Sequence, residues 1–511
     1  MSSRLKKALL LALAAVLLAG VSFVQQSLNR DRDELGLTRV TPLENAPPVL
    51  AFTTVALGGF RGLISNALWM RASELQDQDK FFEMVQLADW ITKLEPHFPQ
   101  VWVVQAWNMA YNISVKFKDF GDRWRWVQRG IGLLRDEGLR YNPNDVVIYR
   151  ELSWFFQHKL GANLDDANMY YKQHWANEMA EVFGKTKPNL DELINPRTEE
   201  EKQRAALLRD KFKMDPVFMK ELDEKYGPLE WRLPEASAIY WAAVGLEKAG
   251  ENPTKVDKNN LINLRRAIYQ SMQLSFQRGR LVADPVTKRF EFGPNLDVIP
   301  KVNAAYEQAI EEDEKYRDNI KRAHRNFLRD AVYFLYGYNH EREAAKWFKY
   351  LATKYPNDDL ITGDTNSLPA NMTLDSYALA RLQEDVGEGN SRDRVKAIVE
   401  GLIFNQFKSL VLDEDDRAEG LWILATKVYQ RYERETSARK EAIGLPPLKE
   451  IQQEVLNRLL DPQTGFLPEI RARLRTKLRL PPELVQPLTN ATPAATAPAT
   501  TNAPAVSTTA R

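Results

Sequence analysis

Cysteine is missing from the whole chain of 511 residues, and its absence excludes several kinds of chemistry. Disulfide bonds, thiolate metal sites, cysteine nucleophiles and a lipid-modified N-terminal cysteine all require that residue. Histidine is scarce, with five residues in the chain, so there is little material for a histidine-rich metal centre. We therefore expect no metal ion and no other cofactor.

An excess of charge of one sign is also missing, because 70 Lys and Arg residues face 69 Asp and Glu residues. Proteins that bind nucleic acid normally carry a basic excess, which replaces the counterions on phosphate. The P-loop, GxGxxG and GxSxG patterns do not occur in the chain. The sequence therefore indicates no nucleic-acid partner, no small-molecule ligand and no catalytic motif.

A long apolar run is present at the N-terminus. Three basic residues precede residues 8–24, which contain no charge. Together with the uncharged residues 25–27, the run reaches the roughly 20 residues that a membrane-spanning helix needs. Basic residues before the run favour a cytoplasmic N-terminus. We expect residues 1–29 to be a cytoplasmic stub and a signal anchor in a bacterial inner membrane, with the remaining chain in the periplasm; a cleavable signal peptide is the alternative.

The two segments that flank the folded part differ from it in composition. Residues 489–511 contain 8 Ala, 7 Thr and 3 Pro, with no aromatic residue. Such a stretch cannot bury enough surface to offset the conformational entropy of the chain. We expect a disordered tail over residues 483–511 and a linker over residues 30–59.

The middle of the chain has mostly helical periodicity. Long helical stretches are separated by short breakers such as Glu95-Pro96 and Asn142-Pro143. Long helices joined by such short turns must pack antiparallel, and helix pairs that repeat along a chain are typical of a helical solenoid. The predicted helices of the N-terminal repeats, within residues 60–183, are 60–76, 80–94, 99–116, 122–140, 145–160 and 164–183.

Two segments interrupt this pattern. Residues 184–230 form a charged helical insertion, in which the spacing from Thr198 to Glu201 predicts a capping box. In residues 279–292, apolar and polar side chains alternate on either side of Asp284-Pro285, and this pattern predicts a β-hairpin. Further helix pairs are expected over residues 231–482. The later predicted helices are 234–248, 259–277, 374–384, 392–412 and 416–433.

The helix pairs resemble tetratricopeptide repeats. Three segments end as such repeats do: LADWITKLEP at 87–96, LLRDEGLRYNPND at 133–145 and AAKWFKYLATKYPND at 344–358. In the last of these, small, aromatic, apolar and proline positions match the family at Ala344, Phe348, Leu351 and Pro356, although alanine is usual at Leu351. The chain begins with the apolar run, followed by RGLISNALWMRA and then by QLADWITKLEP. This order is similar to that of tetratricopeptide proteins of the bacterial envelope whose role is poorly defined. The resemblance implies an all-α fold, a right-handed superhelix of helix pairs.

The resemblance also implies a place for partners to bind. In tetratricopeptide proteins the first helix of each pair faces a concave groove, where side-chain amides bind extended peptides. Polar residues of the helix predicted over 99–116 recur at spacings that place them on one helix face. A solvated polar face without a partner is the alternative. The predicted groove residues are Gln105, Asn108, Asn112, Lys116, Arg150, Ser153 and Gln157.

Other residue groups have a structural interpretation. Trp107 and Tyr111, with Val104 behind them, are interpreted as a core stripe in preference to a stacking platform for ligands. His158, His174 and Glu178 could meet as metal ligands, but the sequence lacks HExxH and favours structural histidines. The Asp165-Asp166 pair and the acidic run 413–416 stand at helix starts, where they are expected to cap helices.

A basic segment stands near the end of the folded part. Residues 468–480 predict a helix with an apolar stripe and basic flanks, which could face anionic lipid or an acidic partner. The alternative is a closing helix with a solvated outer face. The residues of this basic surface are Arg471, Arg473, Arg475, Lys477 and Arg479.

Taken together, the sequence favours a membrane-anchored envelope scaffold that binds partner proteins or peptides and is not an enzyme. This expectation depends on the resemblance, since fold alone does not determine function. Two alternatives are an α/α-toroid enzyme acting on polysaccharide, which would need two convergent carboxylates, and a glycan-binding receptor with a tetratricopeptide core.

Overall fold

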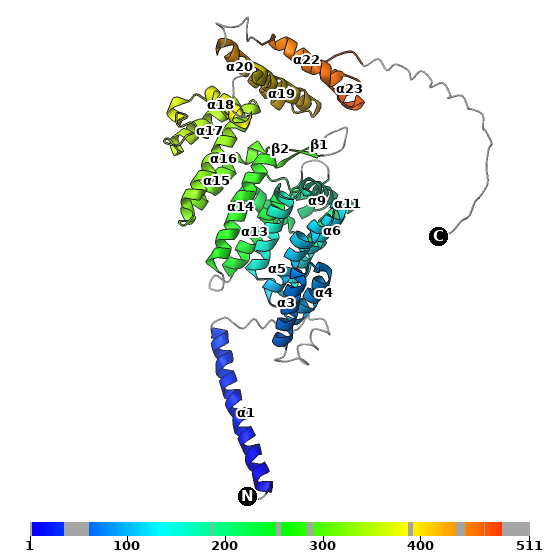
Figure 1. Ribbon diagram of the computed structural model, residues 1–511, viewed down its shortest axis with the longest axis vertical. Coiled ribbons are helices and arrows are strands. Elements are labelled where there is room, and N and C mark those ends of the chain that lie inside the picture. The colour runs from blue at the N-terminus through cyan, green and yellow to red at the C-terminus, as the bar shows by residue number, and fades with distance from the viewer. Residues whose placement is uncertain are drawn as a thin grey trace, which may run out of the picture. The chain divides into compact units, whose positions relative to one another are not determined.

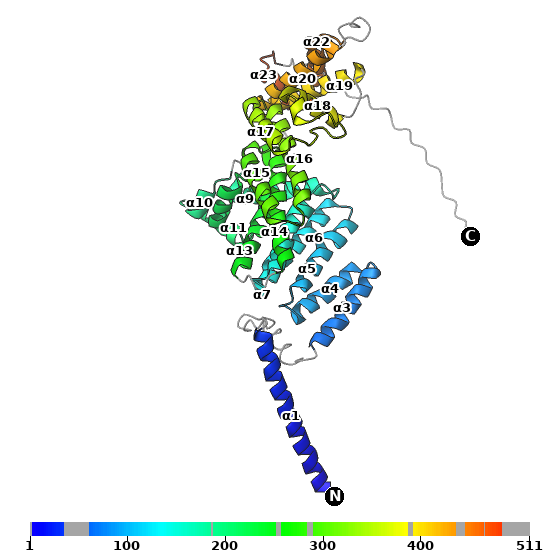
Figure 2. The same ribbon diagram turned by 90° about the vertical axis from the view of Figure 1, so that its left-hand side faces the viewer.

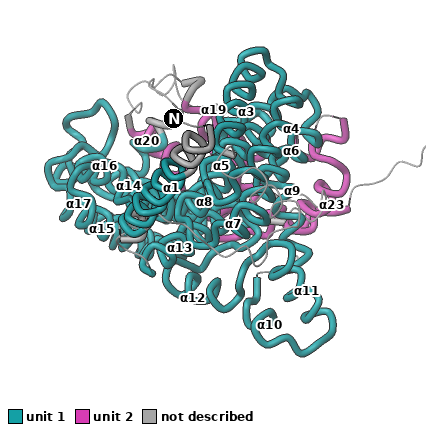
Figure 3. The backbone as a smooth tube through the Cα atoms, turned by 90° about the horizontal axis from the view of Figure 1, so that it is seen from below, with its two compact units in different colours: residues 1–388 teal, residues 389–511 magenta. Residues whose placement is uncertain are grey.

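The protein is almost entirely helical (Figure 1). The computed structural model describes residues 3–34, 61–184, 188–251, 257–283, 290–386, 392–435, 445–463 and 465–482. The chain divides into two compact units, residues 1–388 and 389–511 (Figure 3). The all-α prediction is confirmed, whereas most of the expected linker and the expected tail lie outside the described residues.

The N-terminal helix pairs form where the sequence predicts them. The small deviations lie at helix ends, the largest being a helix that begins at Asn168 because residues 162–167 form a loop before it. Helices α3 and α4 pack against each other, as do α4 and α5 (Figure 2). These elements are α3 (Arg61–Asp77), α4 (Phe81–Leu94), α5 (Pro99–Trp107), η4 (Ser114–Lys116), α6 (Phe120–Gly132), α7 (Leu139–Tyr141), α8 (Val146–Trp154) and α9 (Asn168–Phe183).

Three of these helices continue through π-helical turns in the described part of the chain. The segments are η3 (Asn108–Ile113), η5 (Leu133–Gly138) and η6 (Phe155–Gly161). They prolong α5, α6 and α8 respectively, so each predicted long helix is continuous but changes its hydrogen-bond pattern part-way. π-helical turns are rare and often mark functional sites.

The charged insertion folds into short capped helices. The capping box is confirmed, because Thr198 accepts a hydrogen bond from the backbone N–H of Glu201, whose side chain accepts from Thr198 in return. Asn189 and Asp215 cap the neighbouring helices more simply, because each side chain accepts from the backbone N–H two residues further on. The helices are α10 (Leu190–Ile194), α11 (Glu199–Asp210) and α12 (Pro216–Tyr226).

Helix α13 (Pro234–Glu251) is the most deeply buried helix of the first unit. All of its residues from 234 to 243 are buried, and it packs against α8, η6 and α14 (Lys258–Arg278). Buried Glu235 accepts a hydrogen bond from Arg278 at 2.6 Å. The start of α13 and the end of α14 are thereby joined by a charged contact inside the core.

A two-stranded antiparallel sheet follows α14. Strand β1 (Arg280–Ala283) pairs with β2 (Phe290–Gly293), with Arg280 opposite Gly293. The residues that connect the strands, including Asp284-Pro285, lie outside the described part of the chain. The helices that follow are η8 (Leu296–Val298), α15 (Ile299–Glu312), α16 (Arg317–Gly337), α17 (Glu341–Lys354), η9 (Pro369–Asn371) and α18 (Leu374–Val386).

A buried histidine joins α15, α16 and the end of α17. One ring nitrogen of His324 contacts Oδ1 of Asn303 and the other contacts the hydroxyl of Tyr355, both at 2.8 Å. The ring is fully buried and stacks on Tyr306. Burial lowers the pKa of His324 to about 4, so the imidazole is neutral at pH 7.

The second unit is a separate group of helices: α19 (Arg392–Val411), α20 (Asp415–Glu435), α22 (Leu448–Leu460) and α23 (Pro468–Lys477). Helix α19 packs against the other three. An ion pair of 2.8 Å between Arg458 and Glu400 connects α22 to α19.

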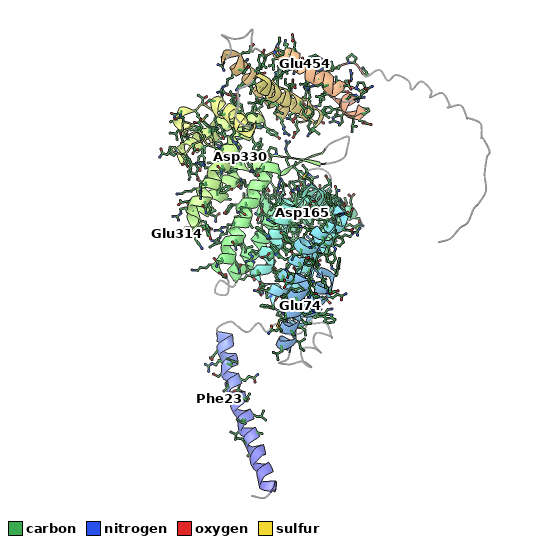
Figure 4. The ribbon with its side chains drawn as sticks, viewed as in Figure 1. Phe23, Glu74, Asp165, Glu314, Asp330 and Glu454 are labelled. Carbon is green, nitrogen blue, oxygen red and sulfur yellow. The ribbon has the colours of Figure 1, made fainter. Side chains whose placement is uncertain are left out.

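Helix α1 (Ser3–Glu34) carries the N-terminal apolar run. Its side chains from 12 to 28 are exposed, including Phe23 at 76% (Figure 4). The side chains of residues 8–11, where the predicted anchor begins, lie outside the described part. A search of the described residues found no helix with the length and apolar character needed to cross a membrane.

We predict that overpacking at Ala344 destabilises the first unit. Ala344 is fully buried on α17, which packs against α16, whereas the next residue, Ala345, is exposed. Adding three carbon atoms in a packed interface costs about 1–3 kcal/mol. Calorimetry should show a melting temperature several degrees lower for Ala344→Leu and nearly unchanged for Ala345→Leu. Equal melting temperatures for the two variants would contradict this packing.

A second prediction concerns pH. Since the pKa of His324 is lower in the folded protein than the ordinary value of 6.5, the unfolded chain binds a proton first as the pH falls. Stability should therefore decrease from about pH 6.5 towards pH 4, by up to roughly 3 kcal/mol from this group.

Urea unfolding midpoints at several pH values would test the role of His324. His324→Gln keeps a donor and an acceptor but does not titrate, so its midpoint should depend less on pH in this range than that of the unaltered protein. The exposed His340 provides the control variant His340→Gln. If both variants keep the original pH dependence, His324 is not the group responsible.

Candidate functional site

The side chains predicted to line a groove on α5 and its continuation are mostly buried. Gln105 is 2% exposed and donates Nε2 to the backbone oxygen of Val85, at 3.3 Å. Asn108 is buried and bonds through its side chain to Asn112. Lys116 is exposed and pairs with Asp79 of the turn before α4, at 3.0 Å. These side chains thus connect α5 and its continuation to α4 and to the turn before α4.

The other predicted groove residues, on α8 and η6, are also used inside the fold. Ser153 is fully buried and donates to the backbone oxygen of Ala238 on α13, at 2.8 Å. Gln157 is buried and donates to the backbone oxygen of Ala267 on α14, at 3.2 Å. Arg150, which is half-buried, donates to Asn260 of α14 at 2.6 Å.

The prediction of an open groove is therefore corrected for Gln105, Asn108, Ser153 and Gln157. A polar side chain on a buried helix face is stable where it reaches a carbonyl or an amide of the adjoining helix. The periodicity places these residues on common helix faces, but it does not reveal that other helices cover those faces.

The aromatic stripe also differs in part from its prediction. Trp107 and Tyr111 stack with ring centroids 4.2 Å apart, and both rings meet Phe155 of η6 edge-on. The indole N–H of Trp107 donates to buried Glu151, at 2.8 Å. This is packing between helices, as expected, but Val104 is 39% exposed and is therefore not part of the buried core.

An open cavity of about 630 Å³ lies between α4, α5 with η3, and α6 with η5. We call it the α4–η5 cavity. Gln86, Asp89 and Trp90 of α4 form one wall, and Gln105 lies on the side formed by α5. The Trp90 side chain is 58% exposed. The volume falls within the range of ligand-binding pockets.

The opposite wall is acidic. Asp136 and Glu137 of η5 line it together with Arg129 of α6. Asp136 is held by both guanidinium arms of Arg135, at 2.7 and 2.8 Å. Glu137 has no hydrogen-bond or ion-pair partner among the described residues. Burial and then the carboxylates of Asp89 and Asp136 raise the pKa of Glu137, and the positive charges of Lys93 and Arg129 partly oppose this shift.

Gln105, on the α5 side of this cavity, contains a buried acceptor without a hydrogen bond. Its Nε2 is occupied by Val85, but its buried Oε1 accepts no hydrogen bond within the described part of the structure. A buried acceptor without a donor is costly, at roughly 1–3 kcal/mol. This oxygen lies beneath the cavity surface, so Gln105 belongs to the packing of α5 against α4.

A second cavity, of about 430 Å³, opens beside η6. Tyr111, Arg123, His158, Lys159 and Asp165 line it. Lys159 is 4% exposed and its ammonium lies 2.6 Å from Asp165. The Tyr111 hydroxyl lies 3.2 Å from Nδ1 of His158, whose pKa is lowered by burial and by Lys159. Lys159 makes this a network of buried charges.

Asp165, marked in Figure 4, is the centre of this network. It pairs with Lys159 and Arg123 and accepts from the Tyr171 hydroxyl and the backbone N–H of Ala167. Although desolvation opposes the shift, these bonds lower the pKa of Asp165 to about 2. The predicted helix cap is not formed, because the N-cap residue of α9 is Ala167, which makes no side-chain capping bond. Asp165 lies in the loop before α9 and holds buried cations that the sequence pattern did not reveal.

The remaining candidate groups have mainly structural contacts. His158 stacks on Trp154, and His174 stacks on Tyr170. No group of three His, Asp or Glu side chains suited to a metal ion occurs among the residues that the structure describes. Gln128 donates to Glu178, the third proposed ligand.

The basic segment of α23 is partly neutralised. Arg473 and Lys477 pair with Asp413, and Lys477 also pairs with Asp415. Arg471 is buried and donates to the backbone oxygen of Phe466. Arg475 donates to the backbone oxygen of residue 481, whereas Arg479 follows the helix in a left-handed conformation. These contacts correct the prediction of a basic surface, because Arg471 is buried and carboxylates neutralise Arg473 and Lys477.

Comparisons with protein-family models, with curated proteins and with solved structures found no match for this chain. The two cavities therefore have to be interpreted from their own chemistry. The charged side chains beside η6 bind one another, whereas the larger α4–η5 cavity has the exposed side chain of Trp90 on its wall. The α4–η5 cavity is the better candidate for binding.

We predict that the buried network stabilises the first unit. Asp165→Asn removes the charge that Lys159 and Arg123 face, and breaking a buried ion pair costs roughly 3–5 kcal/mol. Since the pKa of Asp165 lies below its ordinary value, its stabilising effect should be present above about pH 4 and lost towards pH 2.

Thermal unfolding of two variants would test this network. Asp166→Asn is the matched control, because Asp166 lies in the same loop with its side chain 70% exposed. At pH 7 the melting temperature should decrease strongly for Asp165→Asn and little for Asp166→Asn. Equal effects would mean that the buried ion pair does not dominate.

Proposed function

We propose that the chain is a non-catalytic scaffold, anchored in the inner membrane of a bacterium, that binds a segment of a partner protein in the α4–η5 cavity. The observation that carries this proposal is an open cavity of about 630 Å³ with the exposed side chain of Trp90 on its wall. Partly exposed aromatic side chains and unpaired polar groups are typical of places where a partner completes the contacts.

The arrangement of the helices supports a tetratricopeptide-like superhelix. Ala344 and Leu351 of the best-matching repeat are both fully buried, and Pro356 follows the end of α17. Antiparallel helix pairs of this kind stack into a solenoid with extended binding surfaces. The cavity lies between α4 and η5 and has α5 as its floor, so binding there uses the second helices of successive pairs.

The anchor is supported by the exposed apolar surface of α1. Leu17, Leu18, Phe23 and Val24 are each at least 60% exposed. Apolar area of this size is unfavourable in water and favourable in hydrocarbon. An N-terminal anchor with basic residues before it would leave the helical units in the periplasm.

The carboxylates of the cavity favour binding over glycoside hydrolysis. A glycosidase needs two carboxyl groups that both act on the bond being cleaved. Asp89 pairs with Lys93 at 2.6 Å, and Asp136 pairs with Arg135. Glu137 therefore has no second unpaired carboxylate beside it on this wall of the described structure. The pair of carboxylates that a polysaccharide-cleaving enzyme needs is not formed there, which argues against that alternative.

Photo-crosslinking in intact cells would test the proposal. A benzoylphenylalanine residue placed at Gln86, on the cavity wall, should form a crosslinked complex in the membrane fraction. The matched position is Met70 of α3, which is 70% exposed outside the cavity. Mass spectrometry should map the crosslink to one continuous segment of the partner.

One further variant in the same experiment can refute the proposal. Trp90→Ala should reduce the crosslink at Gln86 several-fold without changing the melting temperature, because the side chain is exposed. If Gln86 and Met70 give the same products, or if Trp90→Ala changes nothing, the cavity is not the binding site.

A further inference from the structure

We propose that the outer face of α3 docks on the surface of the lipid bilayer that holds the chain. This inference goes beyond partner binding in the α4–η5 cavity, and it rests on one part of the proposed function, the anchor α1. Three features carry it: the apolar side chains on both faces of α3, the position of α3 in the chain, and the charges at the end of the helix.

One face of α3 packs against α4 at the edge of the first unit (Figure 2). Ala72 and Leu75 are buried in a core cluster that includes residues of α4, and Leu68 and Trp69 pack against the same cluster. These positions recur three or four residues apart, so they lie on one side of the helix. This inner face explains how α3 joins its helix pair.

The opposite face of α3 is also apolar over its first half. Leu63 and Met70 are 65% and 70% exposed, and Ala67 between them is exposed as well. Spacings of four and three residues place these side chains on a line about 10 Å long, on the side away from α4. Ile64, which is 37% exposed, borders this line. We call these four residues the outer α3 face.

An outer face of this kind is unusual for the first helix of a helical array. That helix normally has a polar outer face, which keeps the end of the array soluble. A helix that is apolar on both faces is normally covered on both. Among the residues that the structure describes, only α1 and α3 carry more than two exposed large apolar side chains. The outer α3 face therefore requires a cover.

The position of α3 in the chain makes the bilayer the nearest apolar cover. Residues 35–60 connect the end of α1 to the start of α3. A chain of this length spans at most about 90 Å, which keeps α3 close to the membrane that contains α1. The charged residues between the apolar run and α3 lie within residues 30–44, whereas residues 46–60 contain none. The chain thus becomes apolar again directly before the outer α3 face.

Charged side chains restrict the contact to the first half of α3. Glu74 continues the line of Leu63 and Met70 by one turn, and it is exposed and paired with Arg71 at 2.5 Å. Asp77, the last residue of α3, is exposed too. Carboxylates remain in water, whereas apolar side chains of a surface helix enter the boundary between headgroups and acyl chains. Helix α3 therefore meets the lipid with its first turns and leaves its last turn in water.

Quenching of a fluorescent label by lipids would test the inference, and a chain without native cysteine accepts a single label. The full-length protein is placed in phosphatidylcholine vesicles with a nitrobenzoxadiazole label on Met70→Cys. Met169→Cys is the matched control, because Met169 of α9 is 54% exposed. Lipids with a nitroxide just below the headgroup should quench the label at position 70 about threefold more strongly than the label at position 169.

Two charge variants make the test specific. Leu63→Glu places a carboxylate on the outer α3 face and should remove most of the difference in quenching. Gln76→Glu adds the same charge at an exposed position on another side of α3 and should leave the quenching unchanged. Since both side chains are exposed, circular dichroism should give the melting temperature of the unaltered protein for each variant.

The outcomes separate lipid from other covers. If the labels at positions 70 and 169 are quenched equally, or if Leu63→Glu changes nothing, docking on lipid is refuted. If the label at position 70 shows the emission of an apolar environment but the lipid nitroxides do not quench it, protein covers the face. That cover would be a second copy or another segment of this chain, and docking on lipid is refuted in this case too.

Flotation of the same vesicles separates this inference from the proposed function. A chain that floats with the vesicles while its label stays unquenched supports the anchor and refutes the docking. A chain that stays in the aqueous fraction refutes the anchor and the docking together. The crosslink at Gln86 decides separately whether the cavity binds a partner.

Discussion

Four cationic side chains of the first unit converge on one short loop, residues 162–167, and on Gly161 at the end of η6. Arg123 and Lys159 pair with Asp165 inside the loop. Lys172 donates to the backbone oxygen of residue 162 and to Asn163, and Arg278 donates to Asn163 and to the backbone oxygen of residue 161. The cations come from α6, η6, α9 and α14, so the loop joins helices that are far apart in the sequence.

The same loop explains why the interior of the unit is partly charged. Arg278 also binds Glu235 at the start of α13, so the loop and the most buried helix share one guanidinium. Breaking any one pair would leave an uncompensated charge in the core, which is far more costly than the pair is stabilising.

Much of the helical framework could be predicted from the sequence, because it follows from local signals. Apolar periodicity, Pro99 at a helix start and the Thr198 capping box act over a few residues and are visible in the sequence. The charged and polar contacts between helices were not predictable. Ser153 finds its partner 85 residues away, and Gln157 finds its partner 110 residues away.

The candidate site was missed for a related reason. Gln105 was identified as a polar residue of interest, but the sequence did not reveal which helices would surround it. Glu137 belongs to the charged stretch Arg135–Glu137, in which the sequence does not distinguish the two carboxylates. Only the geometry shows that Arg135 binds Asp136 and makes no hydrogen bond to Glu137. The one usable signal is that aromatic and acidic residues gather in the segments that form α4 and η5.

The π-helical turns have a consequence for how repeats in such a chain can be detected. A π-helical hydrogen bond spans one residue more than an α-helical bond, so every residue after the turn is rotated by about 100° relative to an uninterrupted α-helix. Positions after η3, η5 and η6 therefore point in directions that a fixed repeat pattern does not assign to them. A pattern aligned to the first half of each helix loses its phase in the second half. The distance of 47 residues between Pro96 and Pro143 contains two of these turns, so helix pairs can remain regular in space while their sequences drift out of register.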